Sequence, residues 1–139
     1  MRAELRRLTD DGARGSAVVD FVLVSVLILG LLLAVLQVAV YVHVRNVVTA
    51  SAQEGARYAA NADVPSDAGA PRTVEIVGRA TSERTAQGLA CTSAEEVEPG
   101  SGLTLVVVRC EGAVPSLVPA LGNLLPLSVT GRSVKEGVQ

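Results

Sequence analysis

The clearest pattern in the chain is a run of 24 residues, Phe21 to Val44, that contains no charged side chain. The hydrocarbon core of a bilayer is about 30 Å thick, and about 20 apolar residues in a helix are enough to cross it. The run therefore predicts a membrane-spanning helix. Good helix formers continue through Ala60, with Val44, Val47, Val48 and Ala52 at helical spacing. We expect one helix over residues 16–60 that crosses the membrane and leaves it as a stalk.

The composition changes sharply after this helix. Residues 61–72 contain two prolines, a glycine and several Asp and Asn residues, which is typical of a linker. Thr73 offers a hydroxyl that could cap a second helix, and a thin apolar stripe follows it up to Leu89. The stripe consists of Val74, Val77, Ala80 and Leu89. We therefore expect one surface helix from Thr73 to Leu89.

Two later segments have the patterns of strands. Leu103 to Cys110 is rich in Val and Leu, as a buried strand is, and Leu127 to Thr130 alternates apolar with polar residues. Because a two-stranded ribbon is marginal in water, the second helix should pack on this antiparallel pair. The expected fold class is α+β, with residues 73–139 forming a small head on a helical stalk.

Two connections within this head have unusual compositions. The acidic run Glu95, Glu96 and Glu98 leads into Pro99–Gly102, and we interpret it as a solvated loop because the ligand spacing of a calcium loop is absent. The segment from Ala113 to Pro126 holds three prolines and six Val or Leu residues with no charge. It could attract a partner, or it could cover the strand pair and complete the core.

The distribution of charge predicts the orientation in the membrane. Four arginines precede the uncharged run, at positions 2, 6, 7 and 14, whereas only Arg45 and Arg57 follow it closely. Positive charge marks the cytoplasmic side, so the N-terminus should be cytoplasmic and the chain from about Arg45 to Gln139, which includes the head, extracytoplasmic. Two cysteines in such a compartment can form a lasting bond, which predicts a disulfide between Cys91 and Cys110 that ties the end of the second helix to the end of a strand.

The composition argues against several classes of function. A net charge of −2 and only three aromatic residues give no basic surface for nucleic acid. One His and one Lys cannot assemble a metal site or an acid–base pair, and no phosphate-binding loop is present. We expect a non-enzyme with no catalytic residues, no cofactor and no bound metal. His43 lies at the expected membrane exit, where polar-tipped rings are common.

Two alternatives exist for processing of the N-terminus. A secretory signal could be cut after Ala50-Ser51-Ala52 to release a soluble domain beginning at Gln53, but the uncharged run is longer than signal sequences require. The other alternative is a cytoplasmic cut between Gly15 and Ser16, which would remove residues 1–15 as a leader and keep the whole membrane helix.

The second alternative is supported by a resemblance. Gly15, followed by four residues and then by Asp20-Phe21, resembles the site that prepilin peptidases cut in type IV pilin-like proteins. The segment Glu54-Gly55-Ala56-Arg57-Tyr58-Ala59-Ala60 is similar to the one that follows the membrane helix in TadE-like pseudopilins. The resemblance covers about Arg14 to Ala60. It departs from the family pattern at Asp20, where the family usually carries Glu.

The resemblance implies a structural role. A prepilin peptidase would cut at Gly15-Ser16, Asp20 would pair with the Ser16 amine of a neighbouring subunit, and the helix would pack with other pilin-like subunits and the Tad assembly platform. The expected location is a bacterial cytoplasmic membrane, in contact with lipid, or the pilus. An alternative from a different functional class is a signal-anchored binding module that is not part of any filament. A chain that is not cleaved after Gly15 would favour this alternative.

Overall fold

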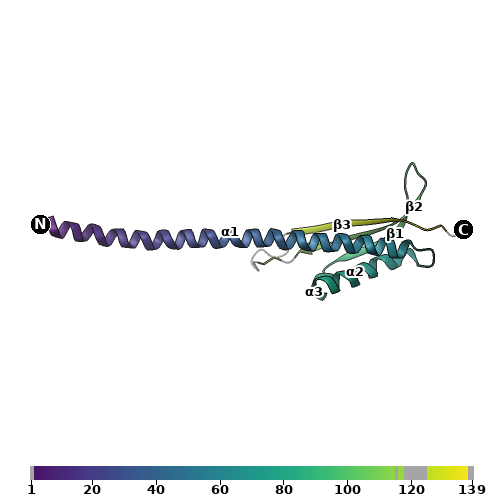
Figure 1. Cartoon of the computed structure of the whole chain (residues 1–139), viewed down its shortest axis with the longest axis horizontal. Helices are drawn as coiled ribbons and strands as arrows, with labels where there is room; N and C mark the ends of the chain where they lie inside the picture. The colour runs from purple at the N-terminus through teal and green to yellow at the C-terminus, as the bar shows by residue number, and fades with distance from the viewer. Residues whose placement is uncertain (1, 115, 118–124, 138–139) are drawn as a thin grey trace. The chain divides into compact units, whose positions relative to one another are not determined.

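The computed structural model describes residues 2–114, 116–117 and 125–137, with side chains from residue 15 onward. The chain divides into two compact units, Met1–Val38 and Ala39–Gln139. The first unit consists of helix only, and the second is an α+β head that includes the last part of the same helix (Figure 1). This confirms the predicted fold class. Each unit is described by itself below.

Helix α1 extends over Arg2–Ala60 and contains 59 residues. It begins well before residue 16, where the membrane helix was expected to start. The reason is local, since Arg, Ala, Glu and Leu dominate the first eight residues and all have high helix propensity. The helix ends at Ala60, where the composition changes to that of turns.

The segment expected to form one surface helix contains two. A short 3₁₀ turn, η1 (Ser66–Ala68), leads into α2 (Gly69–Ala80), and α3 (Glu83–Gln87) follows. The predicted cap at Thr73 is wrong, because Thr73 lies buried inside α2 and donates its hydroxyl to the Gly69 carbonyl at 2.8 Å. The residue that caps a helix here is Ser82, whose Oγ accepts the Thr85 N–H at 3.2 Å. A Ser at this position ends α2 and starts α3.

The sheet has three antiparallel strands in the order β1-β2-β3. They are β1 (Ala90–Val97), β2 (Thr104–Val114) and β3 (Leu125–Val134). The predicted pairing of the last two strands is confirmed, although both are longer than expected. The prediction of a loop through Glu95 and Glu96 is wrong, since both belong to β1. Many side chains of an edge strand stay in water, so acidic residues on such a strand reduce the stability of the fold only a little.

The predicted disulfide between Cys91 and Cys110 is confirmed. The two residues lie directly opposite each other in the β1–β2 register, with their Cα atoms 4.1 Å apart. The bond therefore joins two neighbouring strands and not, as we expected, the end of a helix to a strand. It closes a segment of 19 residues, which restricts the unfolded chain.

The core of the head lies between one face of the sheet and the helices. The last part of α1 contributes a buried ladder of residues spaced four apart, Val44, Val48, Ala52 and Ala56. α2 and α3 contribute Val77 and Ala86, and the sheet contributes Val108, Cys110, Val114, Leu127 and Val129. Because the helix residues at this interface are small, the α1 backbone can approach the sheet closely.

The other face of the sheet is mostly polar. Arg109 and Glu96 form a bidentate ion pair across β1 and β2, with Nη1 to Oε1 at 2.5 Å and Nη2 to Oε2 at 3.1 Å. Glu96 and Arg109 are not directly opposed in the register. Their side chains meet diagonally across Ala94 and Val107, which are opposed. Val107 is accordingly only 1% exposed despite lying on the outer face. The guanidinium lowers the pKa of the Glu96 carboxyl by hydrogen bonding to it.

The closest contact between α1 and the sheet is at Gly131 in β3, and it generates a testable prediction. A Cβ at this position would lie 2.3 Å from the carbonyl carbon and oxygen of Ala52. Backbone atoms cannot rotate away, so we expect Gly131→Ala to destabilise the head by at least about 1–3 kcal/mol, as overpacking does. Thermal unfolding of the full chain in detergent micelles, followed by circular dichroism, would measure this loss.

Gly137→Ala provides the matched control, because nothing lies within 4 Å of its Cβ position. We expect this variant to unfold at the wild-type temperature. If Gly131→Ala unfolds at that temperature too, α1 does not pack on β3 as described.

Candidate functional site on the long helix

The residues of the expected cleavage site lie on the first unit of the chain. Gly15, Ser16 and Asp20 are all exposed and belong to the unbroken helix α1. A Cβ at Gly15 would meet nothing within 4 Å. Gly weakens a helix interior by about 1 kcal/mol relative to Ala, so the helix is locally easier to unwind at Gly15. Gly15 and Ser16 thus lie on the exposed surface of α1.

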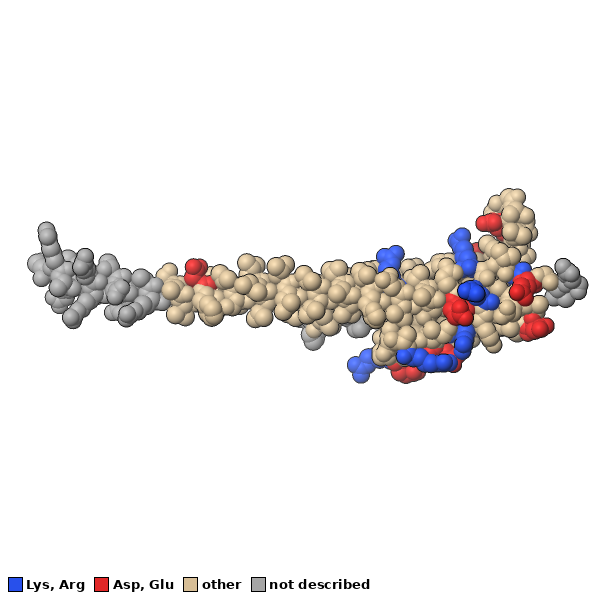
Figure 2. Space-filling model, in the orientation of Figure 1, with Lys and Arg blue, Asp and Glu red and all other residues tan. Residues whose placement is uncertain are grey.

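The following surface of α1 is apolar on all sides. Large hydrophobic side chains are exposed from Val18 to Val42, with Phe21 72% exposed. Figure 2 shows the corresponding length of tan surface, beyond which charged side chains gather over the head. A helix that is apolar all round needs an apolar environment. Among the described residues, one helix is long and apolar enough to cross a membrane, which fits a single-pass anchor.

The segment Glu54-Gly55-Ala56-Arg57 lies in the second unit, where its residues divide into two groups. Gly55 and Ala56 are buried, whereas Glu54 and Arg57 point to the surface. A Cβ on Gly55 would lie 2.1 Å from Thr73 Oγ1 and 2.5 Å from the Gly69 carbonyl oxygen. The small residues of this segment therefore allow α1 and α2 to touch through their backbones.

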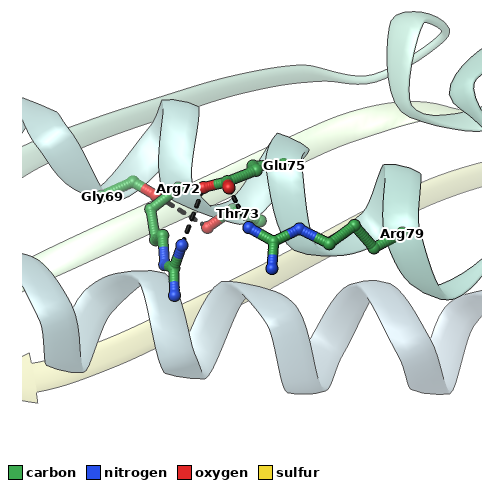
Figure 3. A network of polar contacts seen from close by, with 5 residues as sticks. All are labelled: Gly69, Arg72, Thr73, Glu75 and Arg79. Carbon is green, nitrogen blue, oxygen red and sulfur yellow. Dashed lines mark hydrogen bonds and ion pairs between the residues drawn. The ribbon is translucent and has the colours of Figure 1, made fainter.

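Hydrogen bonds and charged groups surround this contact between the two helices. Thr73 Oγ1, which bonds to Gly69, is also 3.3 Å from the Ser51 carbonyl oxygen on α1. Figure 3 shows Glu75 between Arg72 and Arg79 along the same helix. Hydrogen bonds lower the pKa of the Glu75 carboxyl, and the one from Arg72 has a larger effect than the one from Arg79. Because the side chains of Arg72, Glu75 and Arg79 are exposed, we infer that they keep the surface of α2 soluble and have no catalytic role.

Lys135 holds the end of α1 and was not recognised from the sequence. Its ammonium donates to three carbonyl oxygens just where the helix ends, those of Ala59 at 2.8 Å, Asn61 at 3.1 Å and Val64 at 2.7 Å. The last carbonyls of a helix lack partners within it and carry partial negative charge. The only signal in the sequence was that the chain has a single lysine, placed directly after β3.

An open hollow of about 420 Å³ lies where the uncharged run of α1 ends. Tyr41 and Arg45 from α1 line it together with Glu111, Pro126 and Leu127 from the sheet. The Tyr41 hydroxyl donates to the Pro126 carbonyl at 3.2 Å. Gly112 and Ser128 complete the lining, and Ser128 lies opposite Glu111 in the register of β2 and β3. In the part of the chain that the structure describes, no group of three or more His, Cys, Asp or Glu residues could hold a metal.

Comparison with known proteins supports the resemblance over the long helix. The family model described as TadE-like protein matches residues 15–57. The match begins at Gly15 and ends at Arg57, so it includes the first motif and the first four residues, Glu54 to Arg57, of the second. No curated protein and no solved structure shows significant similarity to the chain. Over these residues the chain is similar to TadE-like proteins, and the apolar helix within them fits a membrane anchor.

The contacts of Lys135 generate the second prediction. Lys135→Met keeps most of the aliphatic side chain but leaves three helix-end carbonyls without their charged donor. We expect a loss of about 1–3 kcal/mol in the stability of the head, the range for a hydrogen bond that involves a charged group. Thermal unfolding of the full chain in micelles would show this as a lower midpoint.

The control for Lys135→Met is Arg132→Met, which removes a cation from an exposed position on β3, three residues before Lys135. Its unfolding midpoint should stay close to that of the wild type. Equal midpoints for the two variants would show that the contacts of Lys135 contribute nothing beyond its charge.

Proposed function

We propose that this chain is a TadE-like minor pseudopilin, a structural component of Tad-type pilus assembly in a bacterial cytoplasmic membrane. The observation that carries the proposal is the family match over residues 15–57, which coincides with the exposed apolar part of α1 and the segment that enters the head. In this proposal the protein performs no chemistry. It acts by packing its helix against other pilin-like helices and against the assembly platform.

The charges around the helix support an orientation with the N-terminus in the cytoplasm. Arginines are concentrated before the uncharged run, and the disulfide in the head suits an oxidising compartment outside the cytoplasm. A prepilin peptidase acting from the cytoplasmic side would then meet Gly15 and Ser16 at the membrane surface. Cleavage would leave a mature chain that begins at Ser16 and keeps its anchor.

Asp20 is the proposed contact between subunits. Its carboxylate lies one residue before the uncharged run, where burial in lipid without a partner is costly. Cleavage at Ser16 creates a cationic amine, and the amine of one subunit would neutralise Asp20 of its neighbour as their helices pack together. The exposed position of Asp20 on α1 leaves it accessible to such a neighbour.

The third prediction tests maturation. The full chain is produced in cells that carry or lack the prepilin peptidase, and intact mass and N-terminal sequencing are measured on the membrane fraction. We expect a start at Ser16 only with the peptidase, and an intact leader in the Gly15→Leu variant. Gly30→Leu is the matched control, since Gly30 lies in the same helix with nothing within 4 Å of its Cβ position, and it should mature normally.

Each other outcome has a defined meaning. An unprocessed wild-type chain in both strains would favour the signal-anchored binding module and remove the main support for assembly. A soluble species beginning at Gln53 would show a secreted domain instead.

The fourth prediction concerns Asp20. Asp20→Ala should still be processed but should co-purify with pilin-like subunits severalfold less than the wild type, because the neighbouring amine loses its partner. Asp20→Glu keeps the charge and restores the residue that is usual in the family, so it should co-purify at least as well as the wild type. Equal recovery of all three proteins would contradict the pairing.

A further inference from the structure

One end of the sheet is fixed to the part of α1 that lies within the uncharged run. The Tyr41 hydroxyl donates to the Pro126 carbonyl at the start of β3. Val40 and Tyr41 also pack against the core cluster that contains Val114, the last residue of β2, and they do so together with Leu125. The end of β2 and the start of β3 are therefore held beside residues 40–41.

This attachment determines how far from the bilayer that end of the sheet can be. The uncharged run ends at Val44, and 24 residues at 1.5 Å each exceed the hydrocarbon thickness of about 30 Å by about one helical turn. Arg45, the first charged residue after the run, favours the headgroups, which places residues 41–44 at the boundary between acyl chains and headgroups. Pro126, bonded to Tyr41, must lie at the same depth.

The residues at this end have the chemistry of a membrane boundary. Tyr41 is amphipathic, and Arg45 follows it by one turn on the same side of α1, which suits the phosphates of lipid headgroups. Leu117, between β2 and β3, is 46% exposed. The sequence from Ala113 to Pro126 contains no charged residue, although residues 118–124 lie outside the described part of the chain.

The far end of the same sheet is different. The turn between β1 and β2 carries Glu98, and Glu95 and Glu96 precede it on β1. Acidic side chains are repelled by anionic lipid, so the β1–β2 turn does not favour contact with a bilayer. The end near Tyr41 carries both Arg45 and Glu111 beside the apolar Pro126 and Leu127.

We propose that the β2–β3 end of the head, defined by Leu117, Leu125 and Pro126, is a second membrane contact that inserts into the leaflet where α1 leaves the bilayer. The occupant of this surface is phospholipid, with acyl chains against the leucines and headgroups against Arg45. The contact would fix the rotation of the head about α1. This inference rests on the membrane anchor of the proposed function.

Tryptophan fluorescence can test the proposal, because the chain contains no Trp and an introduced one reports alone. The full chain is reconstituted in vesicles of phosphatidylethanolamine and phosphatidylglycerol, with and without bromine on the acyl chains. We expect Leu117→Trp to emit at shorter wavelength than Leu103→Trp and to be strongly quenched by the brominated lipid. Leu103 is the matched control, since it is 47% exposed near the opposite end of the sheet.

A third variant separates this proposal from the anchor on which it rests. Leu32→Trp, in the middle of the uncharged run, should be quenched strongly. If it is not, α1 does not cross the bilayer and both proposals fail. If it is quenched while Leu117→Trp is not, only the second contact is wrong. An emission at short wavelength without quenching at residue 117 would show that protein covers this surface, and it would likewise overturn the proposal.

Discussion

The head depends on the close approach of the α1 backbone to its neighbours. At Gly131 the helix touches β3, and at Gly55 it touches α2, in both cases at distances that leave no room for a Cβ atom. The chain has very few aromatic residues, so it cannot fill a wide gap between layers with large side chains. Small residues bring the layers together instead, and dispersion between closely packed backbones replaces the contribution of bulky groups.

This form of packing has a cost that the rest of the head offsets. Ala and Val each bury less apolar surface than Leu or Phe, so each contributes less to stability. A domain of this size with such a core needs additional restraints. The Cys91–Cys110 bond joins the edge strand to the central strand, and Lys135 joins the segment after β3 to the end of α1.

The parts of this fold that could be predicted from the sequence are those set by long or chemically distinctive patterns. The uncharged run predicts α1, the Val-rich segments predict β2 and β3, and the compartment predicts the disulfide. β1 could not be predicted, because an edge strand with Glu95 and Glu96 lacks the alternation on which the prediction depends. Thr73 has the chemistry of a cap, yet tertiary contact with Ser51 places it inside a helix.

In the candidate site, too, the features set by local sequence could be predicted and those set by tertiary contacts could not. Gly15, Asp20 and the segment from Glu54 to Arg57 were found from local spacing, and the family match covers them. The role of Gly55 in packing depends on α2, and that of Lys135 depends on residues more than 70 positions away. Contacts of that kind leave no local trace in a single sequence.

The position of Lys135 also constrains when the head can form during synthesis. The end of α1 is completed by the Lys135 ammonium and by the Glu136 N–H, which donates to the Ala60 carbonyl at 2.8 Å. β3 follows almost eighty residues after the part of the helix on which it packs. A nascent chain therefore carries an uncovered stalk until residue 136 has left the ribosome. In a compartment reached by translocation, this interval is when the protein would need protection from proteases and from premature pairing of its strands.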